Sequence, residues 1–309
     1  MKDVMNDHTR RDFLRNMGLL AGGVAALVSN VPVPAADAAS PDLVVVSGED
    51  PKAMVKRAVA ELGGIRKFVS HGDVVVIKPN MAWVRRPDQG SNTNPDVIAG
   101  LIEMAFDAGA KTVKVFDRGS SETKDYRQAY AVSGIAEAAK KLGAQVPLTY
   151  DLQAVKFQIK DGVFLKESLV YKDALECDCF INVPVAKRHV ITQVTLAMKN
   201  HMGLIADERP RWHKSLDQAL ADFASAFKPK LTVLDAWRIM VRNGPSGGNL
   251  NDLALAKKCI AGVNQVSVDA YGATLFGRQP SDIGHIVLAG KMGVGEVDLA
   301  KMKIAQVTA

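Results

Sequence analysis

Charged and amide side chains follow four short apolar segments of this 309-residue sequence. They are Lys78 and Asn80 after VVVI, Asp117 after TVKVF, Lys187 and His189 after FINVPVA, and Asp235 after LTVL. If the apolar segments are parallel strands, their carboxyl ends meet at one edge of a sheet, where α/β proteins bind ligands. We therefore predict an anion-binding crevice there; for any one of these residues, a polar loop position is the simpler interpretation. Its predicted ligand-binding residues are Lys78, Asn80, Asp117, Lys187 and Asn200.

Three of the six histidines, His189, His201 and His213, lie within 25 residues of one another. Imidazole groups beside carboxylates suit a transition metal or proton transfer near neutral pH, so these three are predicted to bind a divalent metal ion. Their even spacing of 12 residues matches no established ligand motif. Ordinary surface or loop histidines are the alternative interpretation.

The segment TQVTLAMKNHMGL, residues 192–204, is expected to form a helix that ends at Gly203. Helical spacing would place Thr195 and Lys199 on one face, which continues into Asn200 and His201. Such a face can bind an anion, although a solvent-exposed face has the same pattern. The predicted catalytic residues are His189, His201, Lys199 and Asp235.

The three cysteines, Cys177, Cys179 and Cys259, are too few for an iron–sulfur cluster held by this chain alone, because such clusters use about four thiolates. Buried structural thiols are the expected role. Phosphate-loop, nucleophile-elbow and zinc-protease motifs do not occur in the sequence.

Strand-like and helix-like segments alternate along the chain. Strands are expected at 43–46, 74–79, 112–117, 177–185 and 230–236, and helices at 51–64, 93–110, 133–144 and 215–227. Two more of each are expected towards the end of the chain. The alternating segment 153–175, with Asp161 and Gly162 at its centre, predicts an antiparallel hairpin. The fold class is therefore α/β, with a mostly parallel twisted sheet flanked by helices and a small antiparallel insertion.

Residues 1–38 have the order of a twin-arginine export signal. Arg10 and Arg11 precede Phe13 and Leu14, an apolar stretch covers 18–28, and a small-residue cleavage site follows at 36–38. This predicts recognition by the twin-arginine (Tat) translocase, a periplasmic location, and one α/β domain at 39–309. An amphipathic first helix of a cytosolic protein is the alternative.

The net charge of +6 belongs to residues 39–309, because 1–38 contain four cations and four anions. The basic residues form no single run and aromatic residues make up only 6%, so nucleic-acid binding is not expected. After residue 38 no apolar stretch is long enough to cross a membrane, and no span is expected after cleavage.

Several motifs together resemble the family named domain of unknown function 362, over most of residues 42–298. They are VVVIKPN, TNPDVIAGLIEMAFDAGAKTVKVFD, FINVPVAKRHVITQVTLAMKNHMGLI, LTVLDAW with NGPSGG, and VSVDAYGATLFG. The resemblance implies polar family positions without assigning their roles: Lys78, Asn80, His189, Lys199, Asn200, His201, Asp235 and Asp269. It also implies that some relatives carry a ferredoxin-type module, whose cysteine runs this chain lacks.

Three functions agree with these features. The first is an exported redox- or metal-linked enzyme with its site at the strand ends. The second is a periplasmic binding or delivery protein for an anionic ligand or cofactor. The third is a partner subunit exported with a separate iron–sulfur protein.

Overall fold

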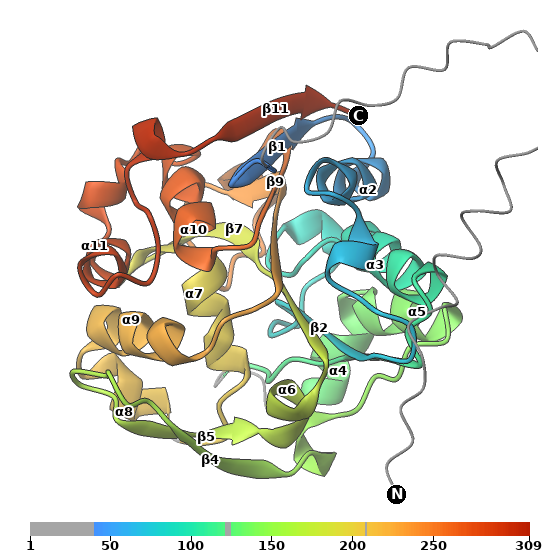
Figure 1. Cartoon of the computed structure of the whole chain (residues 1–309), viewed down its shortest axis with the longest axis horizontal. Helices are drawn as coiled ribbons and strands as arrows, with labels where there is room; N and C mark the ends of the chain where they lie inside the picture. The colour runs from blue at the N-terminus through green and yellow to red at the C-terminus, as the bar shows by residue number, and fades with distance from the viewer. Residues whose placement is uncertain (1–39, 121–124, 208) are drawn as a thin grey trace, which may run out of the picture. The chain divides into compact units, whose positions relative to one another are not determined.

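The computed structural model describes residues 40–120, 125–207 and 209–309 (Figure 1). The predicted export signal, residues 1–38, lies outside the described residues. Among those that are described, no helix combines the length and apolar character needed to cross a membrane.

A central sheet organises the described residues, with strands in the order β11-β1-β10-β9-β6-β2-β3, and β7 and β8 attached beside β9. The strands of this sheet are β1 (Leu43–Ser47), β2 (Val74–Pro79), β3 (Thr112–Val115), β6 (Cys179–Val183), β7 (Val185–His189), β8 (Gln193–Thr195), β9 (Leu231–Met240), β10 (Leu253–Gly262) and β11 (Ile304–Thr308). Neighbours are parallel in β1/β11, β2/β3, β2/β6, β6/β9 and β7/β9, and antiparallel in β1/β10, β9/β10 and β7/β8.

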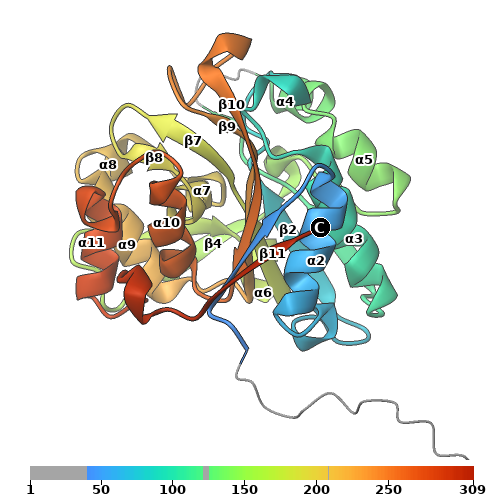
Figure 2. The same ribbon diagram turned by 90° about the horizontal axis from the view of Figure 1, so that it is seen from above.

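Helices cover both faces of this sheet (Figure 2). They are α2 (Pro51–Glu61), α3 (Pro95–Asp107), α4 (Tyr126–Val132), α5 (Ile135–Lys141), α6 (Lys172–Glu176), α7 (Ala197–Asn200), α8 (Arg209–His213), α9 (Leu216–Ala226), α10 (Gln265–Thr274) and α11 (Gly284–Lys291). In Figure 2, α2, α3 and α5 lie on one side of the strands, and α9, α10 and α11 on the other. The predicted α/β class with a mostly parallel, helix-flanked sheet is confirmed.

Strands of this sheet are apolar at successive positions because helices cover both of its faces. In β1, Val44 and Val46 pack into the core beneath α2 and α3, whereas Leu43 and Val45 pack into the core beneath α10 and α11. Successive side chains of a strand point to opposite faces, so a strand covered on both faces needs apolar residues at every position.

The predicted antiparallel insertion is also confirmed. Strands β4 (Ala154–Gln158) and β5 (Glu167–Tyr171) pair with each other in a separate two-stranded sheet. Asp222 of α9 holds the turn between them, because its carboxylate accepts hydrogen bonds from the backbone N–H groups of Val163, Phe164 and Leu165.

The predicted helix over 192–204 is wrong. The chain instead forms a β7–β8 hairpin, in which Lys187 pairs with Thr195, and only the four residues of α7 are helical before a short 3₁₀ turn. Val190, Ile191, Thr192, Val194 and Thr195 are β-branched, a composition that favours strands over helices. Their side chains are the signal that the helical interpretation overlooked.

Candidate functional site

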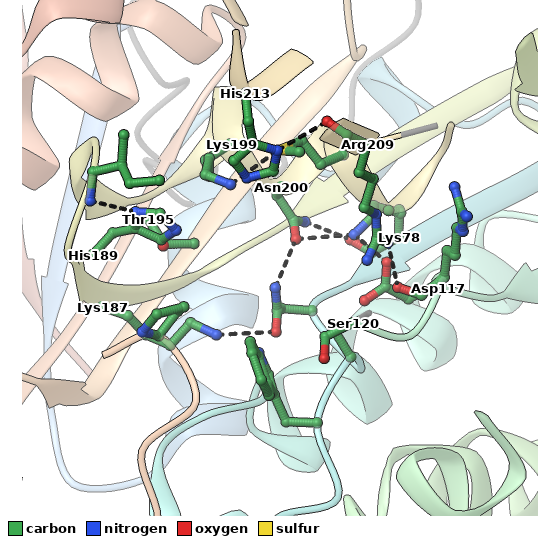
Figure 3. A pocket seen from close by; sticks show the side chains of 18 of the residues that line it. Lys78, Asp117, Ser120, Lys187, His189, Thr195, Lys199, Asn200, Arg209 and His213 are labelled. Atoms are coloured by element: carbon green, nitrogen blue, oxygen red, sulfur yellow. Dashed lines mark hydrogen bonds and ion pairs between the residues drawn. The ribbon is translucent and has the colours of Figure 1, made fainter. Parts of the chain in front are cut away.

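A pocket of about 280 Å³ lies at the carboxyl ends of β2, β3 and β7, where α7 and α8 meet them (Figure 3). Strand β2 contributes Lys78, the loop after β3 contributes Asp117, and β7 contributes Lys187 and His189. The remaining polar side chains that line it are Asn80, Arg118, Ser120, Thr195, Lys199, Asn200, Arg209 and His213. This is the edge of the sheet at which open α/β folds bind ligands.

Lys78 and Asp117 form a buried ion pair at the base of the pocket. Lys78 Nζ lies 2.7 Å from Asp117 Oδ1, and both side chains are 1% exposed. The same ammonium donates to the carbonyl oxygen of Pro79 at 2.7 Å and to Asn200 Oδ1 at 2.9 Å. Burial lowers the pKa of Lys78, and the carboxylate opposes that shift. Lys78 therefore has two hydrogen-bond acceptors and one carboxylate counterion within the protein.

Gly203 allows this ion pair to form. A Cβ atom at Gly203 would lie 1.8 Å from Asp117 Oδ1 and 2.7 Å from Lys78 Nζ, closer than any side chain tolerates. The glycine of the MKNHMG motif is thus explained by close approach to the ion pair rather than by a helix end.

Two amides connect the ion pair to Lys187. Asn200 Oδ1 accepts from Asn80 Nδ2 at 3.3 Å, and Asn80 Oδ1 accepts from Lys187 Nζ at 3.2 Å. Lys187 also donates to the carbonyl oxygen of Ser91 at 2.6 Å and lies over the ring of Trp83. Burial lowers the pKa of Lys187 to about 7.

Lys199, from α7, has different surroundings. Within the described part of the chain, its hydrogen-bond acceptor is the thioether sulfur of Met202 at 2.9 Å, and thioethers accept weakly. Burial, together with the charge of Arg209, lowers the pKa of Lys199 to about 7. This amine therefore lines the pocket with no oxygen acceptor among the described residues.

The two histidines of the pocket are held in opposite tautomers. His189 Nδ1 accepts from the backbone N–H groups of Ile191 at 3.1 Å and Thr192 at 3.3 Å, so the proton is on Nε2. Burial and the neighbouring lysines lower the pKa of His189 to about 3, which keeps the ring neutral. The exposed His213 donates from Nδ1 to the carbonyl oxygen of Arg209 at 2.9 Å, which leaves its Nε2 lone pair free.

Two arginines of the pocket add positive charge, and both donate to backbone carbonyl oxygens rather than to carboxylates. Arg118 donates to the carbonyl oxygens of Ile205 and Asp207, at 2.6 Å and 2.8 Å. Arg209 donates to the carbonyl oxygens of Gly119 and Arg118, at 2.7 Å and 3.1 Å. Burial lowers the pKa of Arg209. Of the described residues that line the pocket, five are lysine or arginine and one, Asp117, is a carboxylate.

Most of the predicted site residues meet in this pocket. Those that line it are Lys78, Asn80, Asp117, Lys187, His189, Lys199, Asn200 and His213. Arg209 was not predicted, because it lies in the short helix α8, which no periodic pattern marks. Ser120 was not predicted as a ligand contact either, whereas Thr195 belongs to the face that was expected to bind an anion.

His201 is apart from the pocket lining, in the core beneath α9. Its Nε2 hydrogen-bonds to Gln265 Oε1, and its ring packs against Phe223 and Phe227. Burial lowers the pKa of His201 to about 3, so the ring is neutral and structural in this position. Among the described residues, no three His, Cys, Asp or Glu side chains come together as a metal site would need. Metal binding by His189, His201 and His213 stays a prediction.

Asp235 also lies apart from the pocket lining, because β9 continues past it to Met240 instead of ending there. Its carboxylate accepts from the backbone N–H groups of Asn94 at 2.7 Å and Trp237 at 3.1 Å. Asn94 is the N-cap of α3, so Asp235 ties that helix to the sheet. Burial raises the pKa of Asp235 to about 6.

The fold and the pocket define an α/β protein with an electropositive cavity at the carboxyl edge of its sheet. Residues 75–274, about two thirds of the chain, match the family Domain of unknown function (DUF362), and the chain belongs to this family. The resemblance that the sequence motifs indicated is thereby confirmed.

One curated relative is the thylakoid-associated protein sll1697 of Synechocystis sp. (strain ATCC 27184 / PCC 6803 / Kazusa). It is 26% identical over 217 residues, which cover 66% of this chain and 64% of that protein.

Two solved structures are similar at low level. The lactate racemase apoprotein from Thermoanaerobacterium thermosaccharolyticum has a TM-score of 0.43 and 12% identity, over 75% of this chain and 56% of that one. A structural-genomics protein from Thermotoga maritima has a TM-score of 0.39 and 13% identity, over 79% of this chain and 60% of that one. The matched stretches cover less than two thirds of each of these relatives.

Proposed function

We propose that this protein binds a small organic anion in the pocket between β2, β3, β7, α7 and α8, and that it acts in the periplasm after export. The observation that carries the binding proposal is the charge of the lining: five lysines and arginines face one carboxylate, and that carboxylate already pairs with Lys78. Such a lining concentrates positive potential in a small cavity with apolar walls.

The groups of the pocket have different parts in binding. Lys78 and Lys187 donate to protein oxygens, so they contribute positive charge to the cavity rather than hydrogen bonds to a ligand. Among the described residues, Lys199 donates only to the Met202 sulfur and the Nε2–H of His189 has no acceptor, so both can donate to a ligand carboxylate or phosphate. The Thr195 hydroxyl is buried and has no partner among the described residues, so it is a third available donor.

The ligand also has an apolar part. Trp83, Met202 and Pro245 line the same cavity, and so do the exposed Val190 and Ile191 at the tip of the β7–β8 hairpin. Small-molecule sites commonly combine apolar walls with a few polar groups that fix orientation. An aromatic or branched carboxylate matches this lining better than a bare inorganic ion does.

Calorimetric titration with phenylpyruvate, 2-oxoglutarate and inorganic phosphate tests the proposal. We expect phenylpyruvate to bind, and the Lys199→Met variant to bind it at least about tenfold more weakly, since a tenfold loss corresponds to about 1.4 kcal/mol. We also expect weaker binding as the pH rises from about 6.5 to 8.5, because Lys199 loses its charge near pH 7.

The exposed Lys214, beyond the end of α8, supplies the matched control. Lys214→Met removes a lysine of the same region that is not among the lining residues, and it should leave binding unchanged. Equal affinity of the wild type and Lys199→Met for every anion, or no binding of any of them, would contradict the proposal.

A further inference from the structure

Lys199 has the surroundings of a reactive amine rather than of a purely electrostatic one. Three lysines line the pocket, and two of them, Lys78 and Lys187, give their hydrogens to oxygen atoms of the protein. Lys199 has only the Met202 sulfur as an acceptor within the described residues. An amine that makes no hydrogen bond to oxygen loses little when its nitrogen becomes neutral.

The charged groups around Lys199 favour its neutral form. Arg209 of α8 is the charge that lowers its pKa after burial. The other titratable groups that line the pocket are Lys78 of β2, Asp117 and Arg118 after β3, Lys187 and His189 of β7, and His213 of α8. Asp117, the one carboxylate among them, is paired with Lys78 and does not compensate Lys199. A large fraction of Lys199 is therefore unprotonated at pH 7 to 8, as nucleophilic lysines require.

We propose that the ε-amino group of Lys199 forms an imine with an organic anion that carries a ketone or aldehyde group, such as a 2-oxo acid. This inference rests on the proposed function, because the anionic group of the ligand must first bind in the pocket. The cationic lining holds the carboxylate, and the carbonyl group beside it meets Lys199.

The chemistry balances without an oxidant or a reductant. The lone pair of Nζ attacks the carbonyl carbon, a C–N bond forms, and the π electrons of the carbonyl move to its oxygen. That oxygen gains a proton and the nitrogen loses one, which gives a carbinolamine. Loss of the hydroxyl group as water then leaves the C=N bond.

The two histidines can assist these proton movements. His189 presents an N–H donor at Nε2, and His213 presents a lone pair at Nε2. The neutral His189 suits a hydrogen bond to the carbonyl oxygen, and His213 suits transfer of the proton from the nitrogen to the departing hydroxyl. Both line the same cavity as Lys199 (Figure 3).

Trapping with borohydride tests the imine. The full-length protein is incubated with phenylpyruvate and reduced with sodium borohydride, and its peptides are then analysed by mass spectrometry. We expect the peptide that contains Lys199 to gain the mass of the oxo acid less one oxygen atom. Lys199→Arg cannot form the imine, so it should lose this adduct. Lys214→Arg should keep the adduct.

The pH profile of trapping separates Lys199 from surface lysines. Trapping should increase up to about pH 7 to 8 and then level off, whereas an ordinary lysine continues to gain reactivity towards its usual pKa near 10.4. If phenylpyruvate binds by calorimetry and no adduct forms on Lys199, the imine is refuted and the proposed function remains. If no anion binds at all, the proposed function itself is refuted. Labelling spread equally over exposed lysines would also overturn the imine.

Discussion

Lys187 and Lys199 link the pocket to the stability of the protein. Burial holds both pKa values near 7, against about 10.4 for a lysine in an unfolded chain. Between these two values the unfolded chain binds protons that the folded chain does not, so the free energy of unfolding increases with pH. Each lysine contributes a slope of at most about 1.4 kcal/mol per pH unit.

We therefore expect stability to rise from pH 7 to about pH 8.5 in urea unfolding experiments. The window stops there because the buried thiol of Cys259 has a raised pKa, so the folded chain retains that proton at higher pH and opposes the trend. Lys199→Met should show a smaller rise than the wild type, and Lys214→Met should show the same rise. A slope that Lys199→Met leaves unchanged would mean that Lys199 titrates normally.

At the scale of elements, α10 positions the helix that carries Lys199 and Asn200. Helix α7 has only four residues, and its N-cap, Leu196, has no side chain that can accept a hydrogen bond. Asp269 of α10 replaces that cap: its carboxylate accepts from the backbone N–H groups of Ala197 at 2.5 Å and Met198 at 3.0 Å. Burial raises the pKa of Asp269 to about 6, so it is charged at neutral pH.

Asp269→Asn tests this positioning role. The amide has one acceptor oxygen in place of two, so one backbone N–H at the start of α7 loses its partner in a buried site. We expect a loss of about 1–3 kcal/mol in the free energy of unfolding, together with weaker binding of phenylpyruvate. Asp50→Asn is the matched control, because Asp50 caps the exposed start of α2 in the same way and asparagine is an equally good N-cap. Equal effects of the two substitutions on binding would refute the role.

Sequence patterns predict best those elements that are buried uniformly or that begin with a capping residue. Strand β2 is apolar at successive positions, and Asn94 with Pro95 marks the start of α3, so both were predictable. The β7–β8 hairpin was missed: its β-branched residues favour strands, but a strand of three residues that begins at Gln193, with positive φ, leaves little periodicity. The sequence prediction therefore placed Lys199 on the face of a long helix. In the structure it lies in the four-residue helix α7, whose start is capped by Asp269.

The same limit applies to the site. Residues that end a parallel strand, such as Lys78, were predictable because topology brings strand ends together. Asp235 has a similar sequence context, yet β9 continues past it, and only the pairing of β9 with β10 along its whole length shows this. His201 was predicted as a site residue because it lies near His189 and His213 in the sequence. Closeness in sequence does not determine whether a side chain faces the pocket or the core.

At the scale of the whole molecule, the basic pocket lies at one edge of a sheet that helices cover on both faces (Figure 2). The pocket combines side chains from segments as far apart in sequence as Lys78 and Arg209, so it exists only in the folded protein. The twin-arginine route exports folded proteins, so a ligand could be bound before export.

The export part of the proposal has its own test. In a Gram-negative host, the full-length chain should reach the periplasm when the twin-arginine translocase is present and stay in the cytoplasm when the translocase is deleted. Replacing Arg10 and Arg11 with lysine should also retain most of the protein in the cytoplasm, because the paired arginines are the recognised feature. Arg15→Lys, outside the pair, is the control and should leave export intact. Cell fractionation and immunoblotting measure the distribution, and equal periplasmic fractions in all of these cells would refute export by this route. The retained Arg10→Lys, Arg11→Lys protein should still bind phenylpyruvate, since the residues that line the pocket are unchanged.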